Sequence, residues 1–379
     1  MLLKDYVKKN WDKMTIADMA RACGVGESSV RRAGQRLGFK PKGRVQTTVS
    51  PVEKFNKKQE ENVIKKQLSE LLKENAILKK KTAVKDNITD YKPYKIPVKK
   101  SSNDHEATAF ALASDWHLEQ LVERSKIIHD NEYNLDIAEK RATQFFQNLL
   151  KLIKKEQQSV QINTLVLWLG GDFITGNIHT ENLKVCQLGP AQAICFARDL
   201  LVSGIQFLLD NTDLNIVIPY NHGNHARITD KVWLSTEEDN SLEYILYDDI
   251  RDRFTGNKRV KMVPPNGSTS MVEVYGLKIF FAHGHHGLTY QGGIGGLYIP
   301  VRKYLARKFS KIQNFYMLCI GHWHQYIQDT QFVCNGSMIG YDQYADSRGL
   351  EPDIPKQTLF LVDSKRKCRT VTTPITFDV

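Results

Sequence analysis

Aspartate, asparagine and histidine residues recur in five short motifs, each of which directly follows an apolar run. In chain order the motifs read D-x-H, G-D, G-N-H, H and G-H-x-H. Their polar residues are Asp115, His117, Asp172, Asn224, His225, His283, His322 and His324. Two carboxylates, one amide oxygen and several imidazoles, without a thiolate, suit borderline divalent metals such as Mn²⁺, Fe²⁺, Ni²⁺ or Zn²⁺. The set is too large for one tetrahedral ion but sufficient for two ions that share a carboxylate.

The apolar runs before these motifs predict the elements that position them. AFALA, TLVLWL, NIVIP, LKIFFA and MLCI are typical of buried strands. The loops at strand ends are where α/β sheets place their sites, so we expect the motifs to meet at one edge. Glycines before Asp172, Asn224 and His322 allow the close turns that converging loops need.

The five motifs in this order resemble the calcineurin-like metallophosphoesterase superfamily, over about residues 107–335. The resemblance implies an α/β fold in which two mixed β-sheets pack as a sandwich flanked by helices. It also implies hydrolysis of a phosphate ester with two divalent ions, and Mn²⁺ is the expected metal. The implied ligands are Asp115, His117 and His324 for the first metal, Asp172 as the bridge, and Asn224, His283 and His322 for the second. His225 would lie beside the phosphate as the catalytic residue, stabilising it or protonating the leaving oxygen.

The sequence departs from the family pattern after G-N-H, where Ala226 and Arg227 replace the usual acidic residue. The group that orients His225 is therefore open, and Arg227 becomes a candidate phosphate ligand. Asn177 or Thr175 is a candidate partner behind the ligands. His285 is either a further site residue or an exposed loop residue.

The basic charge is concentrated at the N-terminus. Residues 1–100 hold 25 basic and 11 acidic residues, whereas the remaining 279 hold 28 and 31. This asymmetry favours a nucleic-acid-binding arm, although a solvated lysine-rich linker is the alternative. The segment TIADMARACGVGESSVRRAGQRLGF resembles a helix-turn-helix in which Gly24 turns the chain, within a predicted domain 1–48. Its second helix would present the DNA-contacting residues Ser28, Ser29, Arg31, Arg32, Gln35 and Arg36, unless the unit is a protein-docking module.

Three further segments complete the expected organisation. Residues 52–84 carry leucines at heptad spacing with Asn75 among them, which favours a two-stranded coiled coil and a homodimer. A single amphipathic helix packed on the body is the alternative. Residues 85–106 are rich in lysine and proline and predict a linker. Residues 107–379 would form the catalytic domain.

The composition excludes a membrane, a collagen-like and a disulfide-rich protein, and three functions remain to be weighed. Six scattered cysteines without C-x-x-C spacing indicate a reducing cytoplasm. The arrangement of domains also resembles the stand-alone phosphoesterases common in bacterial viruses, which implies a bacterial or phage-infected cell. We identify no apolar stretch of membrane length and therefore expect no membrane partner. The expected function is a DNA nuclease recruited by its N-terminal domain, with DNA as partner. The alternatives are a phosphatase or phosphodiesterase for a small nucleotide or phosphoprotein, and a DNA-binding regulator with an inactive phosphoesterase body.

Overall fold

The computed structural model describes residues 3–40, 93–97, 105–178, 182–234, 236–288 and 296–377. The chain divides into two compact units, Met1–Thr89 and Asp90–Val379. The predicted coiled coil at 52–84 lies outside the described residues, as does most of the predicted linker.

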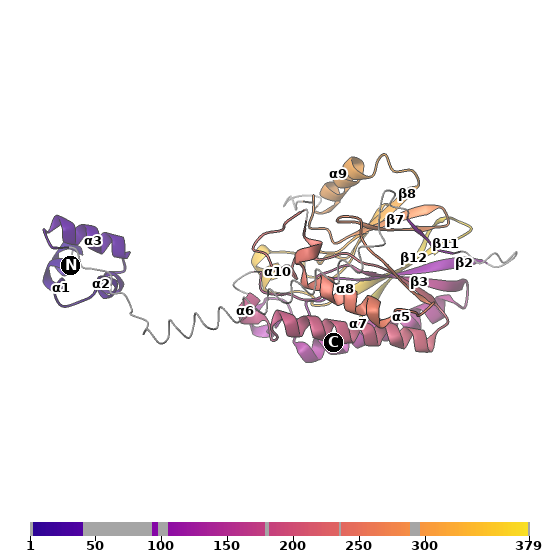
Figure 1. Ribbon diagram of the computed structural model, residues 1–379, viewed down its shortest axis with the longest axis horizontal. Helices are drawn as coiled ribbons and strands as arrows, with labels where there is room; N and C mark the ends of the chain where they lie inside the picture. The colour runs from indigo at the N-terminus through magenta and orange to yellow at the C-terminus, as the bar shows by residue number, and fades with distance from the viewer. Residues whose placement is uncertain are drawn as a thin grey trace, which may run out of the picture. The chain divides into compact units, whose positions relative to one another are not determined.

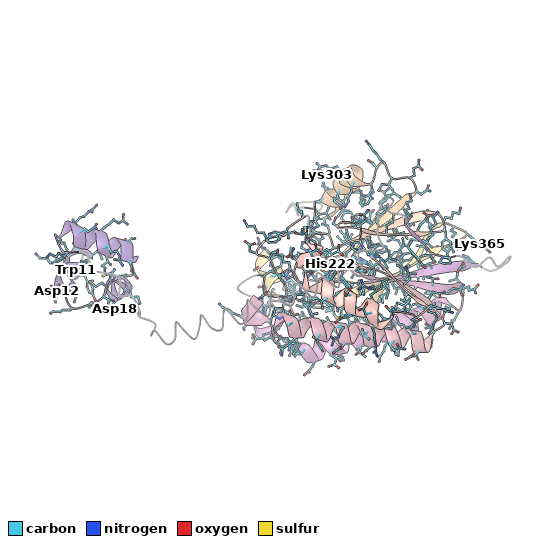
Figure 2. The ribbon with its side chains drawn as sticks, in the orientation of Figure 1. Trp11, Asp12, Asp18, His222, Lys303 and Lys365 are labelled. Carbon is cyan, nitrogen blue, oxygen red and sulfur yellow. The ribbon has the colours of Figure 1, made fainter. Side chains whose placement is uncertain are left out.

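The described part of the N-terminal unit, residues 3–40, contains three short helices: α1 (Leu3–Asn10), α2 (Ile16–Cys23) and α3 (Glu27–Arg36). Gly24 ends α2 at a φ of 63°, a left-handed conformation that glycine adopts without a steric penalty. The turn predicted at this glycine is therefore present. Trp11 lies among the side chains between the helices (Figure 2), and its ring stacks on that of Phe39 at 5.2 Å. DNA binding by α3 stays a prediction.

The second unit is built on two six-stranded mixed sheets. The first has the order β1-β6-β7-β8-β10-β9, and the second has the order β12-β11-β2-β3-β4-β5. The strands of the first sheet are β1 (Tyr94–Lys95), β6 (Ser270–Val274), β7 (Leu277–Ala282), β8 (Phe315–Ile320), β9 (Ile327–Gln328) and β10 (Phe332–Cys334). Those of the second are β2 (Glu106–Ala113), β3 (Gln161–Leu169), β4 (Asn215–Pro219), β5 (Val260–Val263), β11 (Lys356–Asp363) and β12 (Cys368–Thr376).

The two sheets pack face to face through a buried apolar layer. Trp168 from β3 and Phe281 from β7 face each other across it, with ring centroids 5.8 Å apart. Phe110 and Phe360, from neighbouring strands of the second sheet, stack at 4.8 Å in the same layer. Both sheets therefore bury one face in a shared core, which fixes the spacing of the loops at their edges.

Helices cover the outer faces of this sandwich (Figure 1). α5 (Leu135–Glu156), α7 (Pro190–Asn211) and α8 (Leu242–Arg253) supply buried side chains to a core against the second sheet. α9 (Tyr298–Lys308) packs on the first sheet. Shorter elements are η1 (Arg124–Lys126), α6 (Asn182–Val185), η2 (Glu238–Asn240) and α10 (Gln343–Arg348). The expected architecture of two mixed sheets flanked by helices is thus confirmed.

Helix α7 is long and apolar enough, by length and composition, to cross a membrane. The sequence analysis identified no such stretch because Arg198 and Asp199 interrupt the apolar run. In the structure Ile205 and Leu208 of this helix are fully buried against the second sheet. These contacts are those of a core helix in a compact domain.

Strand β1 lies inside the segment predicted as a linker. Tyr94 and Lys95 pair in parallel with Val272 and Glu273 of β6, and Ile96 is buried next to them. A two-residue strand among lysines and prolines has no periodicity to read, so the sequence did not predict it.

Candidate metal centre

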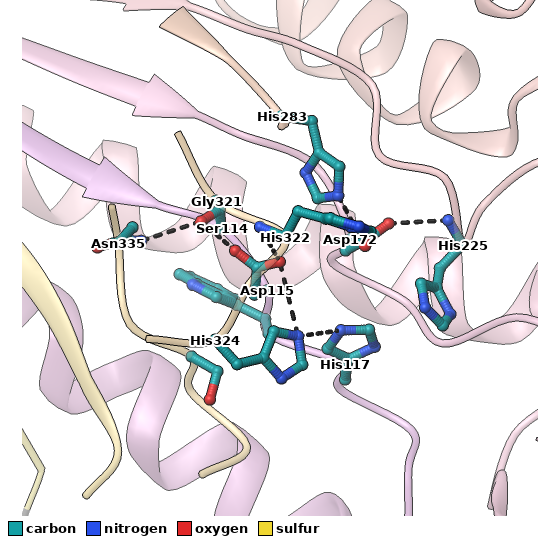
Figure 3. Close-up of polar contacts among 12 residues, drawn as sticks. Ser114, Asp115, His117, Asp172, His225, His283, Gly321, His322, His324 and Asn335 are labelled. Atoms are coloured by element: carbon teal, nitrogen blue, oxygen red, sulfur yellow. Dashed lines mark hydrogen bonds and ion pairs between the residues drawn. The ribbon is translucent and has the colours of Figure 1, made fainter. Parts of the chain in front are cut away.

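The five motifs meet at one edge of the sandwich because their strands are parallel neighbours. Asp115, Asp172 and Asn224 follow β2, β3 and β4, which lie side by side in parallel. His283 and His322 follow β7 and β8, a parallel pair in the other sheet. The carboxyl ends of all five strands therefore open into the same region (Figure 3).

Two groups of ligand atoms form there, each with its atoms within 4.8 Å of one another. The first is Asp115, His117 and His324, and the second is Asp172, His283 and His322. In the first group the Nε2 atoms of His117 and His324 are 3.1 Å apart. The two groups contain all the predicted ligands except Asn224, whose side-chain oxygen is described next.

Unpartnered polar atoms show that the residues fit metal ions. Asn224 Oδ1 and His322 Nδ1 are buried, and neither has a hydrogen-bond partner among the described residues. His283 Nε2 is different, because it forms an ion pair with Asp172 Oδ2 at 2.8 Å. Buried groups without a partner cost about 1–3 kcal/mol each, and a divalent cation would satisfy both Asn224 Oδ1 and His322 Nδ1.

Hydrogen bonds behind the histidines fix which ring nitrogen faces the centre. The Thr175 hydroxyl donates to Gln120 Oε1, so it accepts from His117 Nδ1 at 3.1 Å. His283 Nδ1 donates to the Gly170 carbonyl at 2.7 Å. In both rings Nε2 is thereby the nitrogen that faces the centre, as in histidine metal ligands generally.

Asp172 belongs to the second group and also to a third one with His117 and His225, and His117 is in turn a member of the first group. Burial acts to raise the pKa of Asp172, but the neighbouring His283 and His225 outweigh it and hold that pKa well below its usual range. Burial lowers the pKa of His117 and His322 well below normal. Burial acts to lower the pKa of His283, but the charge of Asp172 beside it raises that pKa to about 10. Metal binding at His283 would therefore release a proton, whereas His117 and His322 are already neutral.

Backbone strain is concentrated at the same residues. Among the described residues, five of the predicted ligands have left-handed φ values of 47° to 70°: Asp115, His117, Asp172, His322 and His324. Such conformations cost on the order of 1–3 kcal/mol each and cluster at functional sites. The approach of the loops is also close, since a Cβ at Gly223 would lie 2.1 Å from Asp172 Oδ1.

The imidazole ring of His225 is oriented by a backbone carbonyl and not by a carboxylate. Its Nδ1 donates to the Thr175 carbonyl at 3.0 Å, and its amide donates to Asp172 Oδ1 at 2.8 Å. Its ring lies 4.8 Å from that of His117. The question raised by the missing acidic residue after G-N-H is answered by the loop that carries Thr175.

Two buried glutamates that the sequence analysis missed hold the loops in place. Glu119 accepts hydrogen bonds from the amides of Thr175 and Gly176, and burial raises its pKa to about 7. Glu243, in the first turn of α8, accepts from the amides of Phe173 and Gly223 and has a pKa raised by burial to about 8. Neither lies in a recognisable motif; the only available signal was an acidic residue in an otherwise apolar setting.

Asp115 is held by a chain of polar side chains. Asn335 donates to the Ser114 hydroxyl at 3.0 Å, and that hydroxyl donates to Asp115 Oδ2. Burial raises the pKa of Asp115. Gln357 accepts from Asn335 and from the Ser114 amide, so the start of β11 supports the ligand as well.

The remaining predicted site residues have varied surroundings. Arg227 donates to the Asn224 carbonyl at 2.6 Å, so it holds the loop, and phosphate binding by it stays a prediction. Asn177 is exposed, whereas Thr175 makes the contacts behind His117 and His225. His285 is part of a separate cluster with Glu237.

The predicted DNA-contacting residues lie on the surface of α3. Arg31 pairs with Glu27 at 3.3 Å, and Arg32 donates to the Ser28 carbonyl. Exposed residues are Ser28, Arg32, Gln35 and Arg36, and half-buried ones are Ser29 and Arg31.

No protein-family model matches the chain, and no curated protein matches it. Among solved structures it is similar to a protein assigned as a 5′-nucleotidase from Staphylococcus aureus, in complex with alpha-ketoglutarate. That likeness has 11% identity and a TM-score of 0.31, and it covers 72% of this chain and 55% of the other, so this chain spans about half of that protein. It is also similar to a protein serine/threonine phosphatase from Saccharomyces cerevisiae, itself similar to human phosphatase PP5. Here the identity is 11% and the TM-score 0.27, with 71% and 76% covered. Both TM-scores are low, so the proposed function rests on the geometry of the site.

Proposed function

We propose that the chain is a two-metal-dependent phosphodiesterase that hydrolyses nucleic acid, most simply a DNA nuclease. The observation that carries the hydrolytic part is the pair of ligand groups joined at Asp172, with buried, unpartnered donor atoms around them. Two divalent ions held in this way activate a water molecule and neutralise a phosphate.

The chain's own residues have separable roles in this reaction. The first ion would be held by Asp115, His117 and His324, and the second by Asn224, His283 and His322, with Asp172 shared. His225 has its Nδ1 committed to the Thr175 carbonyl. Its Nε2 is therefore the atom that would give a proton to the leaving oxygen as the phosphorus–oxygen bond breaks.

The choice of DNA as substrate is supported by the N-terminal unit. Three of the predicted contact residues, Arg32, Gln35 and Arg36, are exposed on one short helix. Guanidinium and amide groups on a helix suit phosphates and base edges. The excess of basic residues in the first 100 residues gives a non-specific attraction to a polyanion.

The test uses the purified full chain with Mn²⁺, offered closed circular DNA, linear DNA and a chromogenic phosphodiester. Asp172→Asn is the matched blank. We expect DNA cleavage that is absent in the blank, and a preference for circles or ends will distinguish endonuclease from exonuclease action.

Two other outcomes would replace the proposal. Hydrolysis of the chromogenic diester with intact DNA would identify a phosphoesterase for small substrates. Binding of metal and DNA without turnover of any substrate would identify a DNA-binding protein with an inactive body.

A further inference from the structure

A second cluster of metal-ligating side chains lies beside the candidate centre and is built from none of its residues. His285 and His286 follow β7 directly, and Glu237 precedes η2. His285 Nε2 lies 2.7 Å from Glu237 Oε1, and His286 Nε2 contacts Glu237 Oε2. The three ligand atoms lie within 4.8 Å of one another.

The composition of this cluster favours a cation over an anion. One carboxylate and two imidazoles form a mixed oxygen and nitrogen set that suits borderline divalent metals. A phosphate would be repelled by Glu237, which contacts both rings. The side chains are largely buried, with exposed fractions of 12% for Glu237, 8% for His285 and 22% for His286. Water therefore competes little for their ligand atoms, while an ion can still reach them from solvent.

A cavity of about 100 Å³ gives access to the cluster. All three residues line it, together with His222 and His283. His222, labelled in Figure 2, has a buried Nε2 with no hydrogen-bond partner among the described residues. The cavity thus connects the cluster to the candidate centre, since His283 belongs to the second ligand group.

The distance to the candidate centre is short. The His285 ring centroid is 5.3 Å from that of His283 and 6.0 Å from that of His322. A cation at the cluster would therefore add positive charge next to the second ligand group.

We propose that Glu237, His285 and His286 form a third divalent-metal site, distinct from the two ligand groups around Asp172. The site takes a borderline cation such as Zn²⁺ or Co²⁺. This inference goes beyond the proposed function and does not depend on it, because it concerns binding and not turnover.

The test is a count of bound Co²⁺ by elemental analysis after gel filtration of the full-length protein. We expect His286→Ala and Glu237→Gln each to bind one equivalent fewer than the unmodified chain. Glu238→Gln is the matched control: it changes a neighbouring carboxylate of the same cavity and should leave the count unchanged. The visible absorption of bound Co²⁺ should lose one component in the two cluster variants alone.

The test compares the number of bound Co²⁺ ions between matched proteins. If the ligand groups around Asp172 bind no metal, that result is therefore recognised separately. The same loss of one equivalent should appear when His286→Ala is added to Asp172→Asn. An equal count with and without His286→Ala, in both backgrounds, would show that the cluster is only a hydrogen-bonded group and overturn the proposal. Circular dichroism of the chelated proteins checks that the variants fold, and Glu237→Gln, which keeps the side-chain size, supplies the count should His286→Ala unfold.

Discussion

Asp172 is the residue that we expect to bridge the two metal ions. It contacts His283 through one oxygen and accepts the His225 amide through the other. We expect Asp172→Asn to abolish nearly all hydrolysis and to weaken metal binding by more than the about 10–100-fold that loss of an outer-shell partner costs. Calorimetric metal titration and turnover of a chromogenic diester measure the two effects. Near-wild-type metal binding and activity in a folded variant would remove Asp172 from the bridging role.

His225 has a role separable from metal binding. His225→Ala should retain the metal ions but slow hydrolysis by about 10²-fold or more, since a proton donor to the leaving oxygen is lost. The loss should shrink for a nitrophenolate leaving group, which departs without a proton. Comparing kcat for activated and unactivated diesters tests this; equal losses on both would assign His225 to phosphate stabilisation instead.

The candidate ligands could be selected from the sequence because each motif follows an apolar run. A strand and its polar end are local, and local patterns are what a single sequence displays. Glu119 and Glu243 could not be predicted, because they reach Thr175 and Gly223 only after the chain has folded. The same holds for Glu237, whose partners His285 and His286 lie almost fifty residues later.

Helix α8 acts on the site through its first turn. Glu243 joins the loop after β3 to the loop after β4 by accepting one amide from each. Glu243→Ala leaves two buried amides unpaired, and about 1–3 kcal/mol is expected for each. We expect lower stability in urea and weaker metal binding. Glu139→Ala, at an exposed position on α5, is the matched control and should change neither.

Glu119, which binds the loop that carries Thr175, makes the free energy of unfolding depend on pH. Burial raises the pKa of Glu119 to about 7 from 4.5, so the folded state binds the proton more tightly than the unfolded state. The stabilisation of the folded state by Glu119 is fully present below pH 4.5 and is lost as pH rises through 7. Its size is on the order of 3 kcal/mol, at 1.4 kcal/mol per pKa unit. In metal-free protein, stability should fall from pH 4.5 to 7 more steeply in wild type than in Glu119→Gln. Parallel urea-denaturation profiles of the two proteins would contradict the assignment.

The arrangement of elements was less predictable than their identity. The sandwich and its helices were expected only because the motif series resembles a known family. The pairing of β11 with β2 joins residues some 250 positions apart, as Phe360 next to Phe110 illustrates. No local pattern encodes such a pairing. Strand β1 was missed because Ile96 is the only buried residue within the described stretch 93–97, in a segment rich in lysine and proline.

At the scale of the whole molecule, we expect DNA recognition and phosphodiester hydrolysis to reside in different units of the chain. The second unit contains its own core and the complete set of candidate ligands, while the basic excess lies in the first 100 residues. Deleting residues 1–84 should therefore cripple DNA cleavage and spare hydrolysis of a small diester.

A milder change in the intact chain tests the same separation. Arg32→Ala combined with Arg36→Ala removes two exposed cations from α3. Each phosphate contact contributes about −0.9 to the slope of log affinity against log salt, so losing two should flatten that slope by up to about 2. Turnover of the small diester should stay unchanged because the ligand groups are untouched. Arg124→Ala, which changes an exposed arginine of the second unit, is the control and should leave the slope as it is.

If the truncated chain cleaves DNA as well as the full chain, with the same salt dependence, the N-terminal helices do not recruit the substrate. Any DNA-binding surface would then have to be sought on the second unit itself.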